Sequence, residues 1–396
     1  MTTQDPSVFD EIIERRGTDS AKWDRMEKVY GVPTDTGLPM WVADTDFRAP
    51  QVVIDRLQKA VSHGIFGYAD NSDEFNAAIQ WWMKNRHGWE VEADWIFTTT
   101  GIVNAVGMCL DAFTAPGDGI VLFTPVYHAF AKVINAAGRR VVELPMIEEN
   151  GRHKMDFAAY DALLDGSEKM VILCSPHNPG GTVWTREELC QLGDFAKRHD
   201  LLLVSDEIHH DLVYPGEKHL PMPVADPSVI DRLLMLTAPS KTFNVAGLHT
   251  GNVIIQDETL RDTFAARMRA INLSGNSLGN FALAAAYSPK GAEWVDAQMA
   301  YLDENRKIFD ETINSIPGLK SMPLQATYLS WVDYADTGMN AEEFYRRVEQ
   351  DAQIAVNHGD TFGTGGKNCA RFNIGTQRAR IEEACTRLKK AFADLQ

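Results

Sequence analysis

Short apolar runs bounded by turn residues recur through the middle of the chain, and segments with a helical pattern of apolar positions separate them. Fully apolar runs of this length are typical of strands that are buried on both faces of a parallel sheet. The pattern predicts strands at Gly119–Phe123, Arg140–Leu144, Met170–Cys174, Leu201–Val204, Leu233–Leu236 and Asn252–Ile255. Because helical segments alternate with these strands, we expect an α/β fold with a mostly parallel sheet covered on both faces.

The helical segments before residue 200 are Pro50–His63, Asp73–Arg86 and Arg186–His199. Thr185 precedes the last of these and Glu188 follows three residues later, which is the pattern of a capping box.

The C-terminal part of the chain has a different pattern. It predicts a long helix from Ala292 to Ile316, a strand at Thr327–Val332, a helix at Ala341–Asp351 and a terminal helix from Arg380. We therefore expect a large domain at 49–288 and a smaller α+β domain that joins 1–48 to 289–396.

Composition narrows the classes of partner. The chain has 396 residues, 44% of them hydrophobic, and a formal net charge of −17. This charge repels nucleic acid and anionic membrane, and no apolar run reaches the length of a membrane span, so we expect neither partner. The first ten residues contain acids and no apolar core, which argues against a signal peptide.

The five cysteines are odd in number and form no C-x-x-C pair, so we expect reduced thiols, no structural zinc and a cytoplasmic protein.

The segment Thr98-Thr99-Thr100-Gly101-Ile102-Val103-Asn104-Ala105 follows the strand-like residues 95–97, and its glycine turn opens an apolar helix. The N-terminus of a helix presents free N–H groups and the positive end of the helix dipole. The turn therefore indicates a phosphate site, and an ordinary capped helix is the alternative.

The loop Ser175-Pro176-His177-Asn178-Pro179-Gly180-Gly181 follows the strand that ends at Cys174. Open parallel sheets place their ligands at the carboxyl ends of strands. Asn178 would offer its amide to a ligand there, and a plain turn is the alternative.

Asp206 follows another buried strand, and a buried carboxylate is costly unless it is paired. A protonated pyridine nitrogen would be such a partner. The neighbouring His209 and His210 raise the alternative of a metal site. We expect none, because adjacent strand residues point to opposite faces and no third ligand lies at a matching spacing.

Lys241 lies in Ser240-Lys241-Thr242, in a turn between two predicted strands. An amine sheltered in this way has a lowered pKa and suits Schiff-base chemistry, whereas a solvated surface charge is the alternative. The order of the three polar residues is more specific than any one of them: 28 positions separate Asn178 from Asp206, and 35 separate Asp206 from Lys241.

These features together resemble the fold-type I enzymes that depend on pyridoxal 5′-phosphate (PLP), the aminotransferase class I/II superfamily. The resemblance covers about residues 30 to 390 and includes Ala370-Arg371-Phe372-Asn373, which matches a substrate-carboxylate motif. A narrower resemblance is to the cystathionine β-lyase (carbon–sulfur lyase) branch of MalY/PatB type. Four segments carry it: 39–47, Phe66-Gly67-Tyr68, Pro125-Val126-Tyr127-His128-Ala129-Phe130 and 240–248.

The resemblance implies an aspartate-aminotransferase-like fold with a mainly parallel seven-stranded sheet, PLP as cofactor, and a role in amino-acid metabolism such as methionine biosynthesis. It implies that Lys241 and Tyr127 are catalytic, with Tyr127 stacked on the pyridine ring. Residues that would hold the cofactor are Gly101, Ile102, Val103, Tyr127, Asn178, Asp206, Ile208, His209, Ser240, Lys241 and, from a neighbouring subunit, Tyr68. Arg371, Asn178 and Ala43 would bind the substrate amino acid, and the role of Tyr68 implies a homodimer with shared active sites.

One position distinguishes the broad resemblance to aminotransferases from the narrower resemblance to the lyase branch. Many aminotransferases have an arginine eight residues after the Schiff-base lysine, and this chain has His249 there. The lyase branch tends to lack that arginine too, so the departure favours the lyase.

Three functions stay open at this point. The first is β-elimination from cystathionine or a related cysteine S-conjugate to give pyruvate, ammonia and a thiol. The second is transamination of aromatic or other apolar amino acids, and the third is a non-catalytic regulator with the same fold.

The G-x-S-x-G pattern of serine hydrolases also occurs once, at Gly275-Asn276-Ser277-Leu278-Gly279. A nucleophile elbow needs a strand before this pattern, and the sequence before it is helix-like, so we do not expect a serine hydrolase.

Overall fold

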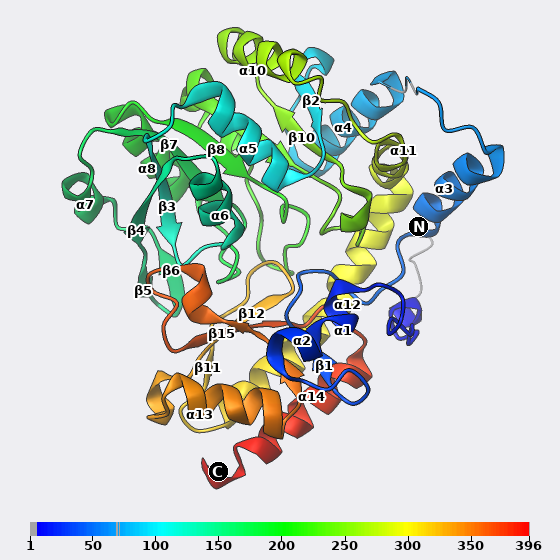
Figure 1. The fold of residues 1–396 in the computed structure, drawn as a ribbon, viewed down its shortest axis with the longest axis vertical. Helices are drawn as coiled ribbons and strands as arrows, with labels where there is room; N and C mark the ends of the chain where they lie inside the picture. The colour runs from blue at the N-terminus through cyan, green and yellow to red at the C-terminus, as the bar shows by residue number, and fades with distance from the viewer. Residues whose placement is uncertain (1–5, 69, 71, 396) are drawn as a thin grey trace.

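A seven-stranded sheet forms the centre of the larger part of the molecule (Figure 1). The computed structural model describes residues 6–68, 70 and 72–395. In spatial order the strands are β2 (Ile96–Thr99), β10 (Gly251–Ile254), β9 (Leu233–Thr237), β8 (Leu202–Asp206), β7 (Glu168–Cys174), β3 (Gly119–Thr124) and β4 (Arg140–Pro145). The five strands β9, β8, β7, β3 and β4 run parallel to one another, and β10 is antiparallel to both of its neighbours, β2 and β9. The mainly parallel seven-stranded sheet is therefore confirmed.

Helices bury both faces of this sheet, as the alternating pattern predicted. One face packs against α5 (Ile102–Phe113), α6 (Ala129–Ala136) and α10 (Glu258–Ala270). The other face packs against α7 (Phe157–Tyr160), α8 (Arg186–Arg198) and α9 (Met222–Ala225). Helix α8 begins where predicted because the capping box forms: Thr185 Oγ1 accepts from Glu188 N at 3.2 Å, and Thr185 N donates to Glu188 Oε2 at 2.8 Å.

A second sheet belongs to the C-terminal part of the chain. It is antiparallel, in the order β11 (Lys320–Ser321), β12 (Leu329–Asp333), β15 (Cys369–Asn373) and β14 (Asn357–His358). Helices α13 (Ala341–Tyr345) and α14 (Arg378–Ala391) accompany it, and β1 (Leu38–Pro39) pairs in parallel with β13 (Ile354–Ala355). The N-terminal segment thus joins the C-terminal part, while the exact boundaries at 48 and 288 stay a prediction.

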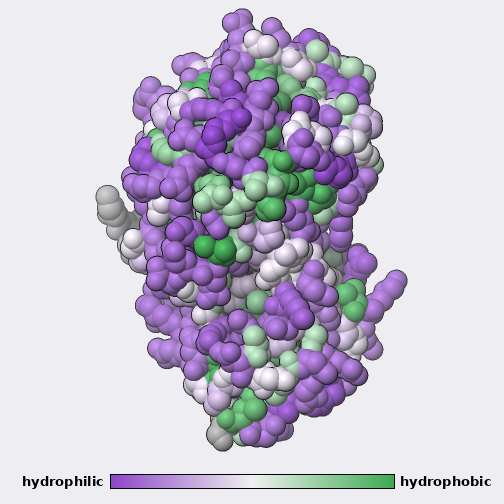
Figure 2. Space-filling model, turned by 90° about the vertical axis from the view of Figure 1, so that its left-hand side faces the viewer, coloured by the Kyte–Doolittle hydropathy of each residue, from purple (hydrophilic) through white to green (hydrophobic). Residues whose placement is uncertain are grey.

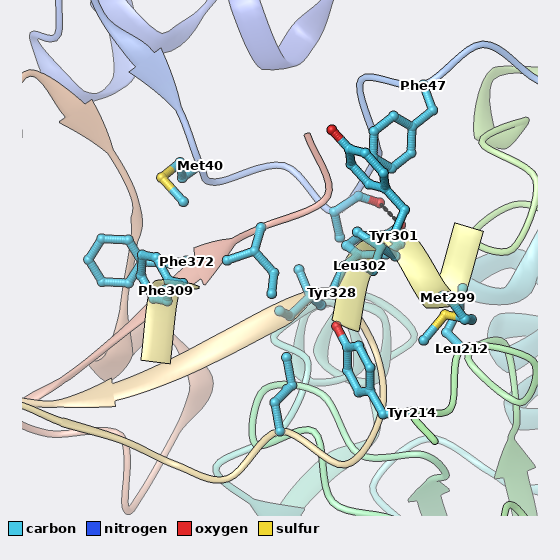
Figure 3. Close-up of a cluster of buried hydrophobic side chains, with 14 of the residues drawn as sticks. Met40, Phe47, Leu212, Tyr214, Met299, Tyr301, Leu302, Phe309, Tyr328 and Phe372 are labelled. Carbon is cyan, nitrogen blue, oxygen red and sulfur yellow. Dashed lines mark hydrogen bonds between the residues drawn. The ribbon is translucent and has the colours of Figure 1, made fainter. Parts of the chain in front are cut away.

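The long helix α12 (Pro289–Ser315) connects the two parts through a shared core. Figure 3 shows side chains of this helix between those of the N-terminal segment, the large domain and the small sheet. The Tyr301 and Phe47 rings lie 5.5 Å apart, and the Phe309 and Phe372 rings lie 5.3 Å apart. Because one apolar cluster spans these elements, α12 fixes how the N-terminal segment lies against the small sheet.

The predicted helix at 341–351 is not a single α-helix. It changes after Tyr345 into a π-helical turn at Arg346–Asp351, where Ala352 N donates to Arg347 O at 2.8 Å. A periodicity of apolar residues does not reveal such a local widening.

The predicted helices at 50–63 and 73–86 are confirmed within one residue at each end, as α3 (Gln51–His63) and α4 (Ser72–His87). The sequence patterns did not predict α1 (Ala21–Asp24), α2 (Met26–Tyr30), α11 (Ser277–Ala286) or the hairpin β5 (Ile147–Glu149) with β6 (Arg152–Lys154).

The surface is mostly polar on the face that Figure 2 shows, with scattered apolar patches. Among the described residues, no helix combines the length and the apolar character that crossing a membrane requires.

Candidate active site

The carboxyl ends of three neighbouring strands bring the predicted polar residues together. Asp206 is the last residue of β8, Asn178 follows β7, and Lys241 follows β9. Parallel neighbours end at the same edge of a sheet, so these side chains meet there.

A cavity of about 290 Å³ lies at this edge. Eleven of the predicted site residues line it: Ala43, Gly101, Ile102, Val103, Tyr127, Asn178, Asp206, Ile208, His209, Ser240 and Lys241. Cys174, Ala246 and His249 line it as well. Of the remaining predicted residues, Arg371 lies behind Asn178, and Tyr68 lies elsewhere on the surface.

The amine of Lys241 lies inside the cavity rather than in solvent. Its Nζ donates to the carbonyl oxygen of Ala43 at 2.6 Å. Burial lowers the pKa of Lys241 to about 8, although Asp44 and Asp206 nearby act in the opposite direction. A larger share of the amine is therefore neutral near pH 7 than in an exposed lysine, which is the form that attacks a carbonyl or accepts a proton.

Two contacts hold the turn that carries Lys241. The neighbouring Thr242 donates from Oγ1 to Asp211 Oδ2 at 2.9 Å, and its carbonyl accepts from Gln298 Nε2 at 3.2 Å. Asp211 and Gln298 come from different parts of the chain, and the sequence patterns gave no sign of either contact.

Asp206 is a buried carboxylate with few partners. Within the described residues its one hydrogen bond comes from Ile208 N at 3.1 Å, and its exposed fraction is 3%. Burial raises the pKa of Asp206 to about 7. A cation beside this carboxylate would compensate the cost of burial, and the protonated ring nitrogen of PLP is a cation of suitable chemistry.

The start of α5 supplies an anion site at the same cavity. Gly101 takes φ +112, and no side chain caps the first turn of the helix. A Cβ added at Gly251 would come within 3.2 Å of Gly101 Cα, so the strand β10 packs close behind the turn. The free N–H groups of this turn, together with Ser240, suit a phosphate.

Arg371 lies on β15 and contacts Asn178, which lines the cavity. Its Nη1 donates to Asn178 Oδ1 at 2.8 Å, and its Nη2 donates to Trp41 O at 2.9 Å and to Asn357 Oδ1 at 2.5 Å. A guanidinium has five N–H bonds, so two are left after these three contacts, enough for a substrate carboxylate. Burial lowers the pKa of Arg371 to about 10, so the group stays cationic at neutral pH.

Tyr127 forms part of the cavity wall, and its backbone N donates to Asn178 O at 3.0 Å. Burial raises the pKa of its hydroxyl, so the phenol is protonated at neutral pH. The ring therefore offers a flat face with an O–H at its edge.

Comparison with known proteins identifies the family. The model for "Aminotransferase class I and II" matches residues 42–388, most of the chain. The protein belongs to the aminotransferase class I and II family.

Within this family, the chain is similar to carbon–sulfur lyases along its whole length. It is 38% identical to cystathionine β-lyase PatB of Bacillus subtilis, over 97% of this chain and 100% of that one. It is 31% identical to protein MalY of Escherichia coli, over 97% and 98% of the two chains. The PLP-containing structure of cystalysin from Treponema denticola superposes with a TM-score of 0.93 at 34% identity, over 98% and 99%. The predicted family, its lyase branch and the fold are confirmed.

The protein also contains a buried histidine cluster that the sequence spacing did not reveal. His87, His210 and Asp211 have possible metal-ligand atoms within 4.8 Å of one another. His87 comes from α4, far from His210 along the chain, and the expectation that no metal binds here stays a prediction. Asp211 already accepts from Trp82 Nε1 at 3.0 Å, His87 Nε2 at 2.9 Å and Thr242 Oγ1. These bonds involve both carboxylate oxygens of Asp211. The buried ring of His210 has no hydrogen-bond partner at either nitrogen among the described residues, although its Nε2 lies 3.1 Å from Asp211 Oδ2.

The G-x-S-x-G segment lies in a helical setting. Asn276 caps α11, Ser277 is the first residue of that helix, and the preceding element is the helix α10. The strand that a nucleophile elbow requires does not precede this serine among the described residues.

Proposed function

We propose that this protein is a PLP-dependent carbon–sulfur β-lyase that cleaves cystathionine or a related cysteine S-conjugate to pyruvate, ammonia and a thiol. From cystathionine the thiol would be homocysteine. The observation that carries the proposal is the cavity lined by Lys241, Asp206, Tyr127 and Asn178, with the guanidinium of Arg371 hydrogen-bonded to Asn178. Similarity to cystathionine β-lyase PatB over 97% of the chain supports the same chemistry.

The predicted cofactor residues at the cavity would each make a different contact with PLP. Lys241 would bind it covalently, Asp206 would pair with the ring nitrogen, and Tyr127 would cover the ring. The start of α5 and Ser240 would bind the phosphate. When bound, PLP supplies an electron sink for the negative charge that develops at Cα.

The substrate steps follow from the same residues. Arg371 would bind the α-carboxylate and so fix Cα near Lys241. The substrate amine would displace Nζ from its covalent link, and the free amine of Lys241 would then take the Cα proton. The Cβ–S bond then breaks, and its electron pair leaves with sulfur as a thiolate, which takes up a proton. Water hydrolyses the remaining three-carbon fragment to pyruvate and ammonia, so one water is consumed for each thiol released.

Transamination would use the same residues up to the proton transfer. His249, which lines the cavity where many aminotransferases have an arginine, favours the lyase.

A pyruvate assay without any keto acid tests the proposal. The purified protein with PLP is expected to release pyruvate and free thiol in equal amounts from cystathionine, and less or none from tryptophan. The panel should include cystine and cysteine, because the preferred sulfur amino acid is open. Turnover that requires an added keto acid would establish an aminotransferase instead.

We further propose a homodimer whose subunits share active sites. Tyr68 lies in the loop after α3 with an exposed fraction of 112%, next to exposed Ile65 at 72% and Phe66 at 64%. Neighbouring exposed apolar side chains are typical of a contact surface, and a tyrosine there could reach a second subunit.

Complementation between two inactive variants tests this sharing. Tyr68→Ala and Lys241→Ala are each expected to lose activity. In a mixed dimer one site keeps both native residues, so co-expression should restore about a quarter of the wild-type sites, as random pairing predicts. Activity that stays at the level of the separate variants would contradict the shared site.

A cytoplasmic location is also proposed. Its support is that all five cysteines are free thiols, four of them buried, as is usual in a reducing compartment.

A further inference from the structure

A second buried carboxylate, Asp211, lies in the segment after β8, close to the turn that carries Lys241. Its side chain is fully buried. Burial would raise the pKa of Asp211, but His210 and His87 lower it well below its usual range, so the group is an anion at neutral pH. A buried anion is costly unless several donors surround it, so the contacts of Asp211 are of interest.

The two oxygens of Asp211 connect α4 to the Lys241 turn. Oδ1 accepts from Trp82 Nε1 at 3.0 Å and from His87 Nε2 at 2.9 Å, and both donors lie on α4. Oδ2 accepts from Thr242 Oγ1 at 2.9 Å. An indole N–H can only donate, so the Trp82 contact requires an acceptor at this place. The carboxylate therefore joins the residue next to Lys241 to a helix from a distant part of the chain.

Packing around this contact leaves the turn little freedom. The Trp82 ring stacks on Tyr287 at 4.7 Å and meets the Phe243 ring edge to face at 5.5 Å. The carbonyl of Thr242 accepts from Gln298 Nε2 at 3.2 Å, and Thr242, Phe243 and Gln298 are buried. Close-packed rings and paired polar groups hold a backbone in one conformation. The root of the Lys241 side chain is therefore fixed.

The tip of the Lys241 side chain is also held. Its Nζ donates to Ala43 O at 2.6 Å, and the same carbonyl accepts from Tyr328 Oη at 3.2 Å. A lysine side chain has four rotatable bonds, so its amine reaches a reacting atom reproducibly only if the backbone that carries it is fixed. A misplacement of about 1 Å can lower a reaction rate on the order of 10²-fold.

We propose that Asp211 is a positioning residue of the active site: through Thr242 Oγ1 it sets the direction in which Lys241 presents its amine to PLP and to the substrate. Stability alone does not call for a charge here, because apolar groups of the same shape often replace buried ionic groups without loss. The inference rests on the role of Lys241 in the proposed function and adds the group that orients this lysine.

The direct test is the rate at which the PLP-free protein attaches PLP. In this step Nζ attacks the aldehyde carbon, a C=N bond forms, and one water leaves with the aldehyde oxygen and both amine protons. The visible absorbance of the linkage follows the step. Thr242→Val keeps the shape of the side chain but removes the donor to Asp211, so attachment should be about tenfold slower. Thr242→Ser keeps the hydroxyl and should stay within about twofold of wild type.

Coupling between the two residues tests the part of Asp211 itself. Asp211→Asn should slow attachment about as much as Thr242→Val, and the double variant should be no slower than Thr242→Val alone. The control is Thr386→Val, an exposed threonine of α14 whose Oγ1 donates to Glu382 O at 2.9 Å; it should attach PLP at the wild-type rate. If Asp211→Asn does not fold, the two Thr242 variants still decide the matter.

Turnover separates positioning from a general structural role. Thr242→Val should lower kcat for pyruvate release about tenfold, with KM within about twofold because Arg371 is unchanged, and deuterium at Cα should slow it more than wild type. In Lys241→Ala supplied with a small primary amine, Thr242→Val should cause no further loss, because the base is no longer attached to the turn. A further tenfold loss there would overturn the proposal.

Attachment and turnover also distinguish this inference from the proposed function. If Thr242→Val attaches PLP as fast as wild type, the positioning role is refuted whichever reaction the enzyme catalyses. If Thr242→Val attaches PLP slowly, Thr242→Ser attaches it normally and the wild type releases no pyruvate, the positioning role stands and the lyase function fails.

Discussion

Lys241→Ala is expected to lower pyruvate release by a factor on the order of 10³ to 10⁴ and to abolish the borohydride-fixed attachment of PLP. The magnitude is that of losing a positioned general base, and the covalent link disappears with the amine. Steady-state pyruvate release measures the first effect, and mass spectrometry of the reduced protein measures the second.

The position and the lowered pKa of the Lys241 amine explain why this one substitution should have so large an effect. The amine of Lys241 is held at the cavity by a 2.6 Å bond to Ala43 O, and its pKa is lowered to about 8. Addition of a small primary amine should therefore restore part of the proton transfer to Lys241→Ala, whereas a misfolded variant would not respond. Lys390→Ala, which removes an exposed lysine of α14, is the matched control. Near-normal turnover in Lys241→Ala would refute the assignment.

Asp206→Asn is expected to lower kcat/KM by about 10² to 10³ and to weaken PLP retention, because the amide keeps the shape but not the charge that pairs with the ring nitrogen. Dialysis followed by PLP quantification measures retention. Asp206→Glu, which keeps the charge, should retain more PLP than Asp206→Asn.

The same substitution, Asp206→Asn, should raise the stability of the PLP-free protein at pH 8, although it weakens the retention of PLP. The pKa of Asp206 is raised from 3.8 to about 7 by burial, so the folded state binds a proton that the unfolded state releases. The stability that this protonated carboxyl contributes is complete below about pH 4 and is lost as the pH rises through about 7. PLP-free Asp206→Asn should therefore melt higher than PLP-free wild type at pH 8, and the difference should shrink toward pH 4. A variant that is less stable at both pH values and also loses PLP would point to a structural role for Asp206.

The sequence determined the sheet and the positions of three polar residues on it. Apolar runs bounded by turns predict buried strands, and parallel strands end at one edge. For this reason the sequence alone predicts that Asn178, Asp206 and Lys241 lie together. The capping residues Thr185 and Glu188 fixed the start of α8 in the same local way.

Only the tertiary structure decided which distant groups complete the site. Arg371 was visible as a motif, but its contacts with Asn178, Trp41 and Asn357 depend on how the small sheet packs against the large one. The support of Thr242 by Asp211 and Gln298 has the same origin. Periodicity and turn chemistry act over a few residues, whereas these contacts arise from the packing of α4 and α12 around shared cores, which no local pattern encodes.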